Sequence, residues 1–139
     1  MSTRFGLDVR GIAQTYAALR EAAMTTAQRR EVLDGLRRGG EVIAGLARRG
    51  VRVRSGDLLE SISVGDATVG VNRISVKIYA ARPKGSHGLV VERGHMARGG
   101  KGRVRAYPYL APALEDGREA ALNEVAEGVS AALKRSVSK

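Results

Sequence analysis

Residues Ile74–Ala80 read Ile-Ser-Val-Lys-Ile-Tyr-Ala, so apolar and more polar side chains alternate along the whole stretch. This period of two is typical of a strand with one face against a core and the other toward solvent. The same alternation runs through Ser61–Val64 and resumes at Val69–Val71 after a turn signal at Gly65-Asp66. Asn72-Arg73 is suited to a tight connection. The middle of the chain is therefore predicted to form a short antiparallel meander with one buried face.

A helix is predicted just before this β region. Thr25 and Gln28 have the capping-box spacing, so the helix should start there and stop at Gly50. Its apolar stripe consists of Val32, Leu33, Leu36, Ile43, Leu46 and Ala47. Four glycines at positions 35, 39, 40 and 45 each weaken it by about 1 kcal/mol relative to Ala. Such a helix needs tertiary packing, or a close backbone approach by a neighbour, to persist.

Two further helices are expected toward the chain ends. Asp8 is suited to cap the first of them, whose apolar face would hold Val9, Ile12, Tyr16, Leu19 and Ala23. The last helix has its period in Leu110, Leu114, Ala121, Leu122, Val125, Val129 and Leu133. Glu115 and Asp116 suit the positive end of its dipole, and Pro112 is tolerated in a first turn. This order predicts an α+β fold, with the meander packed against N-terminal helices and a long C-terminal helix.

Length and composition limit the class of protein. With 139 residues the chain is long enough for one compact domain, which we take to span residues 1–139. The absence of Cys excludes a disulfide framework, a thiolate nucleophile and a Cys-ligated metal. No apolar run approaches 18 residues, and residues 1–10 do not resemble a signal peptide. We therefore expect a protein that is intracellular or is assembled from an intracellular pool.

Positive charge is concentrated in two blocks of the chain. The net charge is +10, and most of the basic residues are Arg. Residues 1–54 hold eleven basic and five acidic side chains, and residues 81–105 hold seven and one. An excess of this size indicates a polyanionic or acidic partner.

The second block contains a Gly-rich segment, residues 93–105, that we expect to be a flexible basic loop. Gly is too dense between Gly94 and Gly102 for the segment to hold a helix or strand by itself. Two interpretations remain open at this point. The segment is either an arm that orders on contacting a partner or a solvated surface loop.

No arrangement of residues predicts catalysis. His87 and His95 lie near only one acid, Glu92, in no spacing that is typical of a metal site. Gly99–Gly102 lacks the strand and the Ser or Thr of a phosphate-binding loop, and Gly85–Gly88 does not present a nucleophile. We therefore predict no enzyme, no catalytic residue, no cofactor and no metal.

Three motifs, in this order, resemble those of one known family. Ser55-Gly56-x-Leu58-x-x-Ser61-Ile62 is similar to its T/S-G-x-L-x-x-S-I signature. Leu89-Val90-Val91-Glu92-x-Gly94 resembles its hydrophobic-E-x-G element. Pro108-Tyr109-Leu110-x-Pro112-Ala113-Leu114 resembles its P-F-L-x-P-A-L element, which leads into the C-terminal helix. The family is the tail-completion, or head–tail joining (neck), proteins of lambdoid-type long-tailed bacteriophages, from which the chain departs in Ser55, Tyr109 and an enlarged Arg/Gly-rich segment.

The motif residues also suit structural roles. Gly56 allows a tight turn, and Leu58 and Ile62 are placed to enter the core. Glu92 is the single acid in a basic segment, so we expect it to pair with an arginine of its own or a neighbouring subunit. Tyr109 and Leu110 would fill the core beneath the last helix.

The resemblance implies a structural virion protein without catalytic activity. Such a subunit forms a ring, expected to be hexameric, that completes the tail and joins it to the head connector while genomic DNA passes through the lumen. Its location would be the virion neck, after assembly in the host cytoplasm. Contacts with other subunits and with connector or tail-tube proteins are expected from Arg93, Arg98, Lys101, Arg103, Arg105, Glu92, Arg37 and Arg38. The alternative is a small basic protein that binds DNA without sequence preference.

Overall fold

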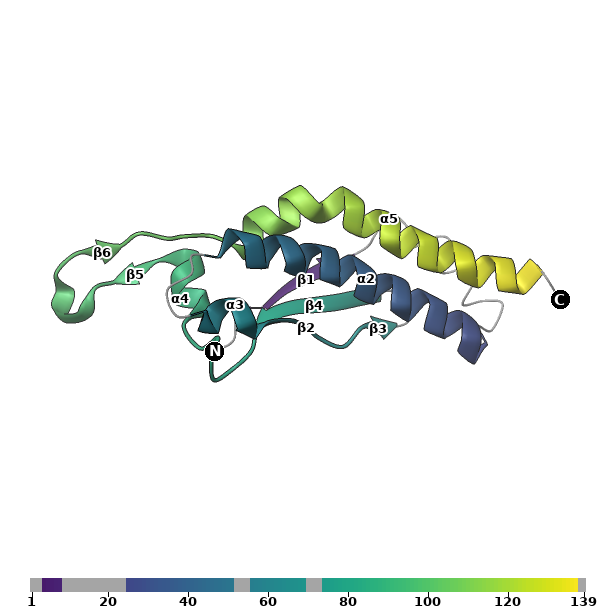
Figure 1. Cartoon of the computed structure of the whole chain (residues 1–139), viewed down its shortest axis with the longest axis horizontal. Coiled ribbons are helices and arrows are strands. Elements are labelled where there is room, and N and C mark those ends of the chain that lie inside the picture. The colour runs from purple at the N-terminus through teal and green to yellow at the C-terminus, as the bar shows by residue number, and fades with distance from the viewer. Residues whose placement is uncertain (1–3, 9–24, 52–55, 70–73, 138–139) are drawn as a thin grey trace.

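The computed structural model describes residues 4–8, 25–51, 56–69 and 74–137 (Figure 1). Helices α2 (Thr26–Gly50) and α5 (Leu110–Val137) lie side by side against one face of a small antiparallel sheet. The sheet consists of β1 (Arg4–Asp8), β2 (Ile62–Val64), β3 (Thr68–Val69) and β4 (Ile74–Ala80). The remaining elements are α3 (Asp57–Ser61), α4 (Gly88–Arg93), β5 (His95–Met96), the 3₁₀ turn η1 (Arg98–Gly100) and β6 (Arg103–Val104). The predicted α+β class with a long C-terminal helix is confirmed.

Strand β4 is the centre of the sheet because it pairs with every other strand. Ile62 of β2 lies opposite Ala80, and Val69 of β3 lies opposite Ile74. Between these two pairings the register shifts by one residue, which is the mark of a β-bulge. β2 and β3 are therefore two halves of one interrupted edge strand, which pairs antiparallel with β4. Val71 and the expected turn at Asn72-Arg73 lie outside the described residues.

Strand β1 on the other edge of β4 was not expected from the sequence. It runs antiparallel to β4, with Arg4 opposite Tyr79 and Asp8 opposite Ser75. Its sequence, Arg-Phe-Gly-Leu-Asp, contains a central Gly and only two large apolar residues, so its local strand signal is weak. The strand is therefore stabilised by its backbone pairing with β4 rather than by its own β-propensity. The helix expected at Val9, Ile12, Tyr16, Leu19 and Ala23 lies outside the described residues.

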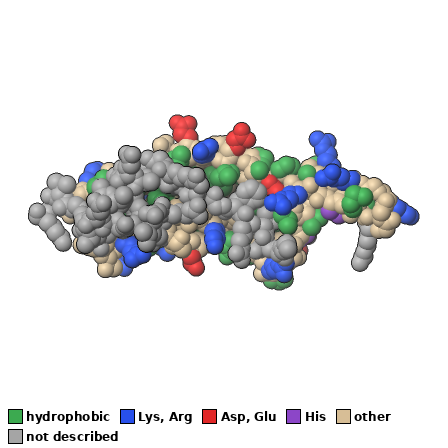
Figure 2. Space-filling view, turned by 180° about the vertical axis from the view of Figure 1, so that it is seen from behind, with side chains coloured by type: hydrophobic (Ala, Val, Ile, Leu, Met, Phe, Trp, Pro, Cys, Tyr) green, Lys and Arg blue, Asp and Glu red, His purple; other side chains and the backbone are tan. Residues whose placement is uncertain are grey.

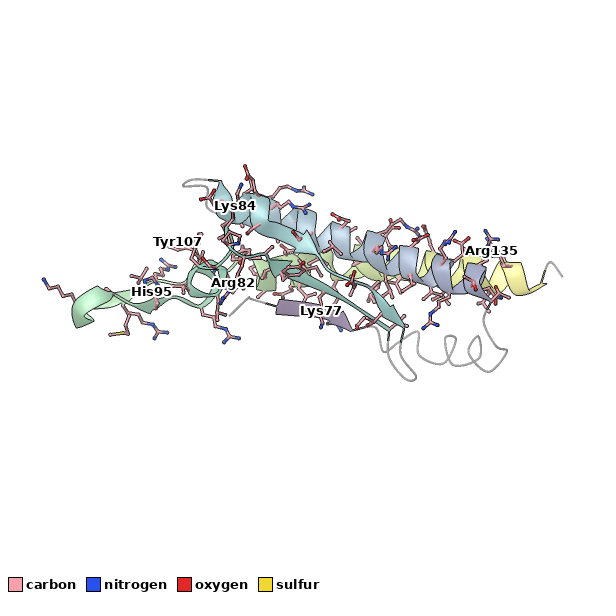
Figure 3. All side chains as sticks on the ribbon, turned by 90° about the horizontal axis from the view of Figure 1, so that it is seen from below. Lys77, Arg82, Lys84, His95, Tyr107 and Arg135 are labelled. Carbon is pink, nitrogen blue, oxygen red and sulfur yellow. The ribbon has the colours of Figure 1, made fainter. Side chains whose placement is uncertain are left out.

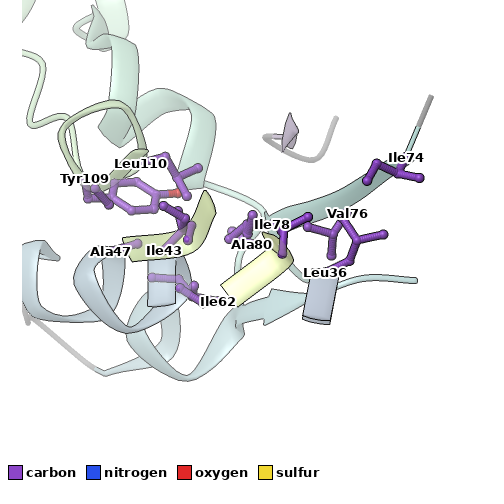
Figure 4. Close-up of a cluster of buried hydrophobic side chains, with 14 of the residues drawn as sticks. Leu36, Ile43, Ala47, Ile62, Ile74, Val76, Ile78, Ala80, Tyr109 and Leu110 are labelled. Carbon is purple, nitrogen blue, oxygen red and sulfur yellow. The ribbon is translucent and has the colours of Figure 1, made fainter. Parts of the chain in front are cut away.

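The alternation that predicted β4 decides which face of the sheet is buried. Ile74, Val76, Ile78 and Ala80 are buried, whereas Lys77 between them is exposed. The buried side chains meet Leu36 and Ile43 of α2, together with Ile62, in one apolar cluster (Figure 4). Tyr109 and Leu110 close one end of this cluster, as expected, and both are buried. Among the side chains that the structure describes, the core is aliphatic apart from Tyr109.

Helix α2 begins and ends where the sequence predicted. The Thr25 side chain accepts a hydrogen bond from the Gln28 backbone N–H, and the Gln28 side chain accepts one from the Thr25 N–H. This reciprocal pair is the predicted capping box, and it satisfies two of the backbone N–H groups that a helix start leaves free. The helix ends at Gly50.

Glycines allow α2 and α5 to approach each other closely. A Cβ built on Gly35 would lie 2.9 Å from the Cα of Gly128, and one on Gly39 would lie 2.9 Å from the Ala121 carbonyl oxygen. These separations are too short for a real Cβ, so the two backbones touch where only Gly fits. The expected close backbone approach is confirmed at these positions. Gly45 differs, because nothing lies within 4 Å of its added Cβ.

Polar contacts fix the relative position of the two antiparallel helices. The Gln28 side chain is buried and donates to the Ala132 carbonyl oxygen at 3.2 Å. Arg38 pairs with Glu124 at 2.9 Å, and Arg135 pairs with Glu31 at 2.9 Å. Exposed pairs of this kind contribute at most about 1 kcal/mol each, so packing at the glycines dominates. Leu133, expected in the buried stripe of α5, is instead exposed.

Two substitutions in the same helix should have opposite effects on stability. Gly35→Ala forces the helices apart, and we expect the free energy of unfolding to fall by about 1–3 kcal/mol. Gly45→Ala fills open space and removes a flexible residue, so we expect an increase of up to about 1 kcal/mol. Urea unfolding followed by circular dichroism measures both. Equal effects of the two substitutions would contradict the close approach at Gly35.

Candidate functional site

Residues 95–104 form a hairpin arm that extends beyond the helices along the long axis of the molecule (Figures 1 and 3). His95 of β5 lies opposite Val104 of β6, and Met96 lies opposite Arg103. The arm carries exposed apolar side chains, since Met96 is 64% and Val104 is 41% exposed. The segment expected to be an irregular loop therefore contains two short strands. The reason lies at the base of the arm, where the chain is held at several points.

Glu92 is the main anchor at the base of the arm. Its side chain is only 5% exposed. Its Oε2 accepts hydrogen bonds from the backbone N–H of Tyr109 at 2.7 Å and of Leu110 at 3.0 Å, and its Oε1 accepts one from Ala111 at 3.0 Å. These N–H groups form the start of α5, where the helix dipole also favours a negative charge. A carboxylate from a distant part of the chain thus caps α5.

This cap corrects two predictions from the sequence. Glu92 was expected to pair with an arginine of its own or a neighbouring subunit, but its hydrogen-bond partners within the chain are backbone N–H groups. Glu115 and Asp116 were expected to supply charge at the helix start. The first turn of α5 contains no acidic residue, and both side chains are exposed farther along. Glu92 takes that role because the fold places it directly in front of the helix.

Gly94 lets the two ends of the arm cross closely. A Cβ on Gly94 would lie 2.6 Å from the Val104 carbonyl oxygen and 2.8 Å from the Ala106 nitrogen. Its φ of +72° is also in the region that favours Gly. Just beyond this crossing, the Tyr107 N–H donates to the Val91 carbonyl oxygen at 2.8 Å. In the Glu-x-Gly motif, Glu92 therefore caps α5, and Gly94 allows the two backbone segments to cross.

The three motifs that are separate in sequence meet beneath this base. A Cβ on Gly88 would lie 2.6 Å from the Tyr109 hydroxyl oxygen and 3.2 Å from Cδ1 of Leu58. Gly56 has a φ of +82° at the start of α3, which agrees with the predicted tight turn. Ile62 and Leu58 are buried as expected. Ser55 lies outside the described residues, and Pro108 and Pro112 are exposed.

Ser61 was expected at the start of an alternating strand, but it belongs to α3. It is the last residue of α3, its side chain is buried, and its hydroxyl donates to the Leu58 carbonyl oxygen at 2.7 Å. A Cβ on Gly85 would lie 2.6 Å from the Ser61 Oγ and from the Ala80 carbonyl carbon. The turn at Gly85–Gly88 therefore packs directly on the end of β4. The spacing of its two glycines was the only sequence signal for this contact.

Lys84 and Glu60, which the sequence did not single out, tie this turn to α3. Their side chains form an exposed ion pair. The hydrogen bond from Lys84 to Glu60, followed by the charge of Glu60, raises the pKa of Lys84 above its ordinary value. Arg48 of α2 adds a further link, since it donates to the Ile62 carbonyl oxygen at 2.8 Å.

The predicted interface residues occupy two separate places. Arg93 ends α4, Arg98 is in η1, and Arg103 is in β6, so these residues belong to the arm or its base. Lys101 and Arg105 are exposed in the same segment, and Figure 2 shows basic side chains along it. The other two residues lie in the middle of α2, where Arg37 is 3.5 Å from Asp34 and Arg38 pairs with Glu124. Of the predicted interface residues, the larger group of exposed basic side chains therefore belongs to the arm and its base.

Among the described residues, no three His, Cys, Asp or Glu side chains are grouped so that they could hold a metal ion. His87 precedes α4 and His95 lies in β5, and both are exposed. Among the described helices, none is both long and apolar enough to cross a membrane. The candidate site is therefore the arm, which carries exposed basic and apolar side chains and is held at its base.

Glu92→Gln should loosen the arm and destabilise the fold. The amide removes the negative charge and leaves one acceptor oxygen for three N–H groups, so we expect a loss of about 2 kcal/mol of unfolding free energy. Hydrogen exchange should also accelerate at the Tyr107, Tyr109 and Leu110 amides. Glu41→Gln removes an exposed carboxylate that pairs with Arg48 and should change stability by less than about 0.5 kcal/mol. Unchanged exchange at the base of the arm in Glu92→Gln would show that Glu92 does not hold it.

Comparison with family models, with curated proteins and with solved structures finds no match to this chain.

Proposed function

We propose that this chain is a structural subunit of the neck of a long-tailed bacteriophage. In this proposal, copies of the chain assemble into a ring that completes the tail and joins it to the head connector. Genomic DNA passes through the lumen of that ring. The protein acts by assembly, and the arm makes contacts between subunits or with neck partners.

The observation that carries the proposal is the meeting of the three motifs at the base of the arm. Leu58 from the first motif and Tyr109 from the third both face Gly88, just before the second. Glu92 of the second motif caps the helix that the third motif begins. A chance resemblance in three short segments gives no reason for them to form one structural unit. Their contact therefore supports the resemblance to the neck family.

The shape of the arm gives separate support to an assembly role. A two-stranded hairpin is marginally stable by itself, and this one extends beyond the helices with Met96 and Val104 exposed. Its base is fixed by Glu92 and Gly94, so the arm is presented in a defined direction. Exposed apolar groups on a fixed projection are suited to burial against a partner protein.

Sequence-independent DNA binding is the second candidate, and the exposed cations favour it. Arg93, Lys101, Arg103 and Arg105 are close in sequence on and beside the arm, and all are exposed. Such groups would contact phosphates without reading bases. In the neck proposal the same groups face a protein surface, and passing DNA is not held tightly.

Particle mass and shape distinguish the two candidates. For the purified 14.8 kDa protein we expect annular particles of about six subunits at low salt, seen by mass photometry and negative-stain imaging. Duplex DNA should leave these particles unchanged. A stable monomer at high concentration would contradict autonomous ring formation.

The salt dependence of DNA binding provides the second measurement. A protein that binds duplex DNA through six or more phosphates should show a slope of log K against log salt of about −5 or steeper. The neck proposal predicts weak binding, with no such slope at ordinary salt concentrations. A monomer that coats DNA with the steep slope would establish the second candidate instead.

A further inference from the structure

Helix α5 presents an acidic stripe to solvent. Between residues 110 and 133, five residues are acidic and Arg118 is the one basic residue. Glu124 pairs with Arg38 at the helix interface. The other four are exposed and define the acidic stripe: Glu115, Asp116, Glu119 and Glu127.

The spacing of these residues places them on the side of α5 away from the core. At 3.6 residues per turn, they fall on the opposite side from Gly117, Ala121 and Val125, which are buried. Exposed small apolar residues, including Ala120 and Ala126, lie on the same side. Figure 2 shows acidic side chains along the edge of the body where α5 runs. The stripe thus combines carboxylates with shallow apolar surface.

The arm has the complementary pattern. Arg103 lies in β6 and Arg105 follows it just beyond the end of the strand; both are exposed, and Met96 lies opposite Arg103. Two residues of chain separate the Cα atoms of the two arginines by at most about 7 Å. Glu115 and Glu119 are four residues apart on the helix, which is a rise of about 6 Å. Two arginines and an apolar Met therefore match two carboxylates beside small apolar residues.

Among the described residues, no ion pair joins Arg103 or Arg105 to Glu115 or Glu119 of the same chain. The arm extends beyond the helices at the end where α5 begins, whereas α5 runs back along the body in the other direction (Figures 1 and 3). The Glu92 cap fixes that arrangement, because it joins the base of the arm to the first residues of α5. The acidic stripe is therefore open to the arm of another molecule.

We propose that the arm of one copy docks on the acidic stripe of a second copy, with Arg103 and Arg105 facing Glu115 and Glu119. The contact joins two different surfaces, so repeating it gives a closed ring or an open filament rather than a two-fold dimer. The inference rests on the proposed function in that both require self-assembly, and it adds the pair of surfaces that meet.

Charge reversal tests this pairing directly. We expect Arg103→Glu/Arg105→Glu, the arm variant, to remain monomeric at low salt because its carboxylates would face the acidic stripe. Glu115→Arg/Glu119→Arg, the stripe variant, should remain monomeric for the same reason. An equimolar mixture of the two should assemble again, since the acidic arm of one now matches the basic stripe of the other. Sedimentation velocity measures all three samples.

Arg30→Glu/Lys77→Glu serves as the matched control. Arg30 lies near the start of α2 and Lys77 in the middle of β4, both are exposed, and the two substitutions change net charge as much as the arm variant does. This control should assemble like the wild-type protein. Thermal unfolding of each variant confirms that it is folded before its mass is interpreted.

The outcomes separate the inference from the proposed function. Wild-type assembly that survives both reversals, or a mixture that stays monomeric, would overturn the docking of arm on stripe while leaving the ring proposal standing. A wild-type protein that is monomeric at every concentration and low salt would overturn both. An arm variant that assembles normally but loses duplex DNA binding would also overturn the docking and assign the arm to DNA.

Discussion

The buried carboxylate of Glu92 is the contact on which the functional end of the molecule depends. Burying a charge away from water is unfavourable by several kcal/mol unless hydrogen bonds replace the lost solvation. Here three N–H groups at the start of α5 do so, and those groups would otherwise lack partners themselves. The carboxylate and the N–H groups thus satisfy each other's hydrogen bonds. One side chain therefore fixes α4, the arm and the first turn of the longest helix together.

A second constraint sets the distance between the two long helices. Gly35 and Gly39 lower the intrinsic stability of α2, yet they allow its backbone to contact Gly128 and Ala121 of α5. Because backbone meets backbone there, even a methyl group would have to displace one of the helices. The helix pair then covers the buried side of β4 and leaves the acidic stripe of α5 toward solvent. On α5, the helical period places the residues that pack against α2 on one side and the acidic residues on the opposite side.

The arm joins these constraints to the proposed assembly role. Its strands are too short to bury their own apolar side chains, so Met96 and Val104 remain exposed. The body supplies a fixed base, and the acidic stripe on α5 supplies the matching charge, which in our proposal belongs to a second copy. Fold stability and assembly thus use different residues: Glu92 and Gly94 hold the arm in place, whereas Arg103 and Arg105 are free to meet a partner.

The sequence by itself determined the elements whose signals are local. The capping box at Thr25, the end of α2 at Gly50, the alternation of β4 and the start of α5 near Leu110 all depend on nearby residues. It did not determine β1, the bulge that joins β2 to β3, or the partner of Glu92. These features pair segments far apart in the chain, and a local pattern does not record which distant N–H or strand edge will be adjacent. Only the tertiary structure decided them, because packing α2 against the sheet and α5 against α2 brings those groups within hydrogen-bond distance.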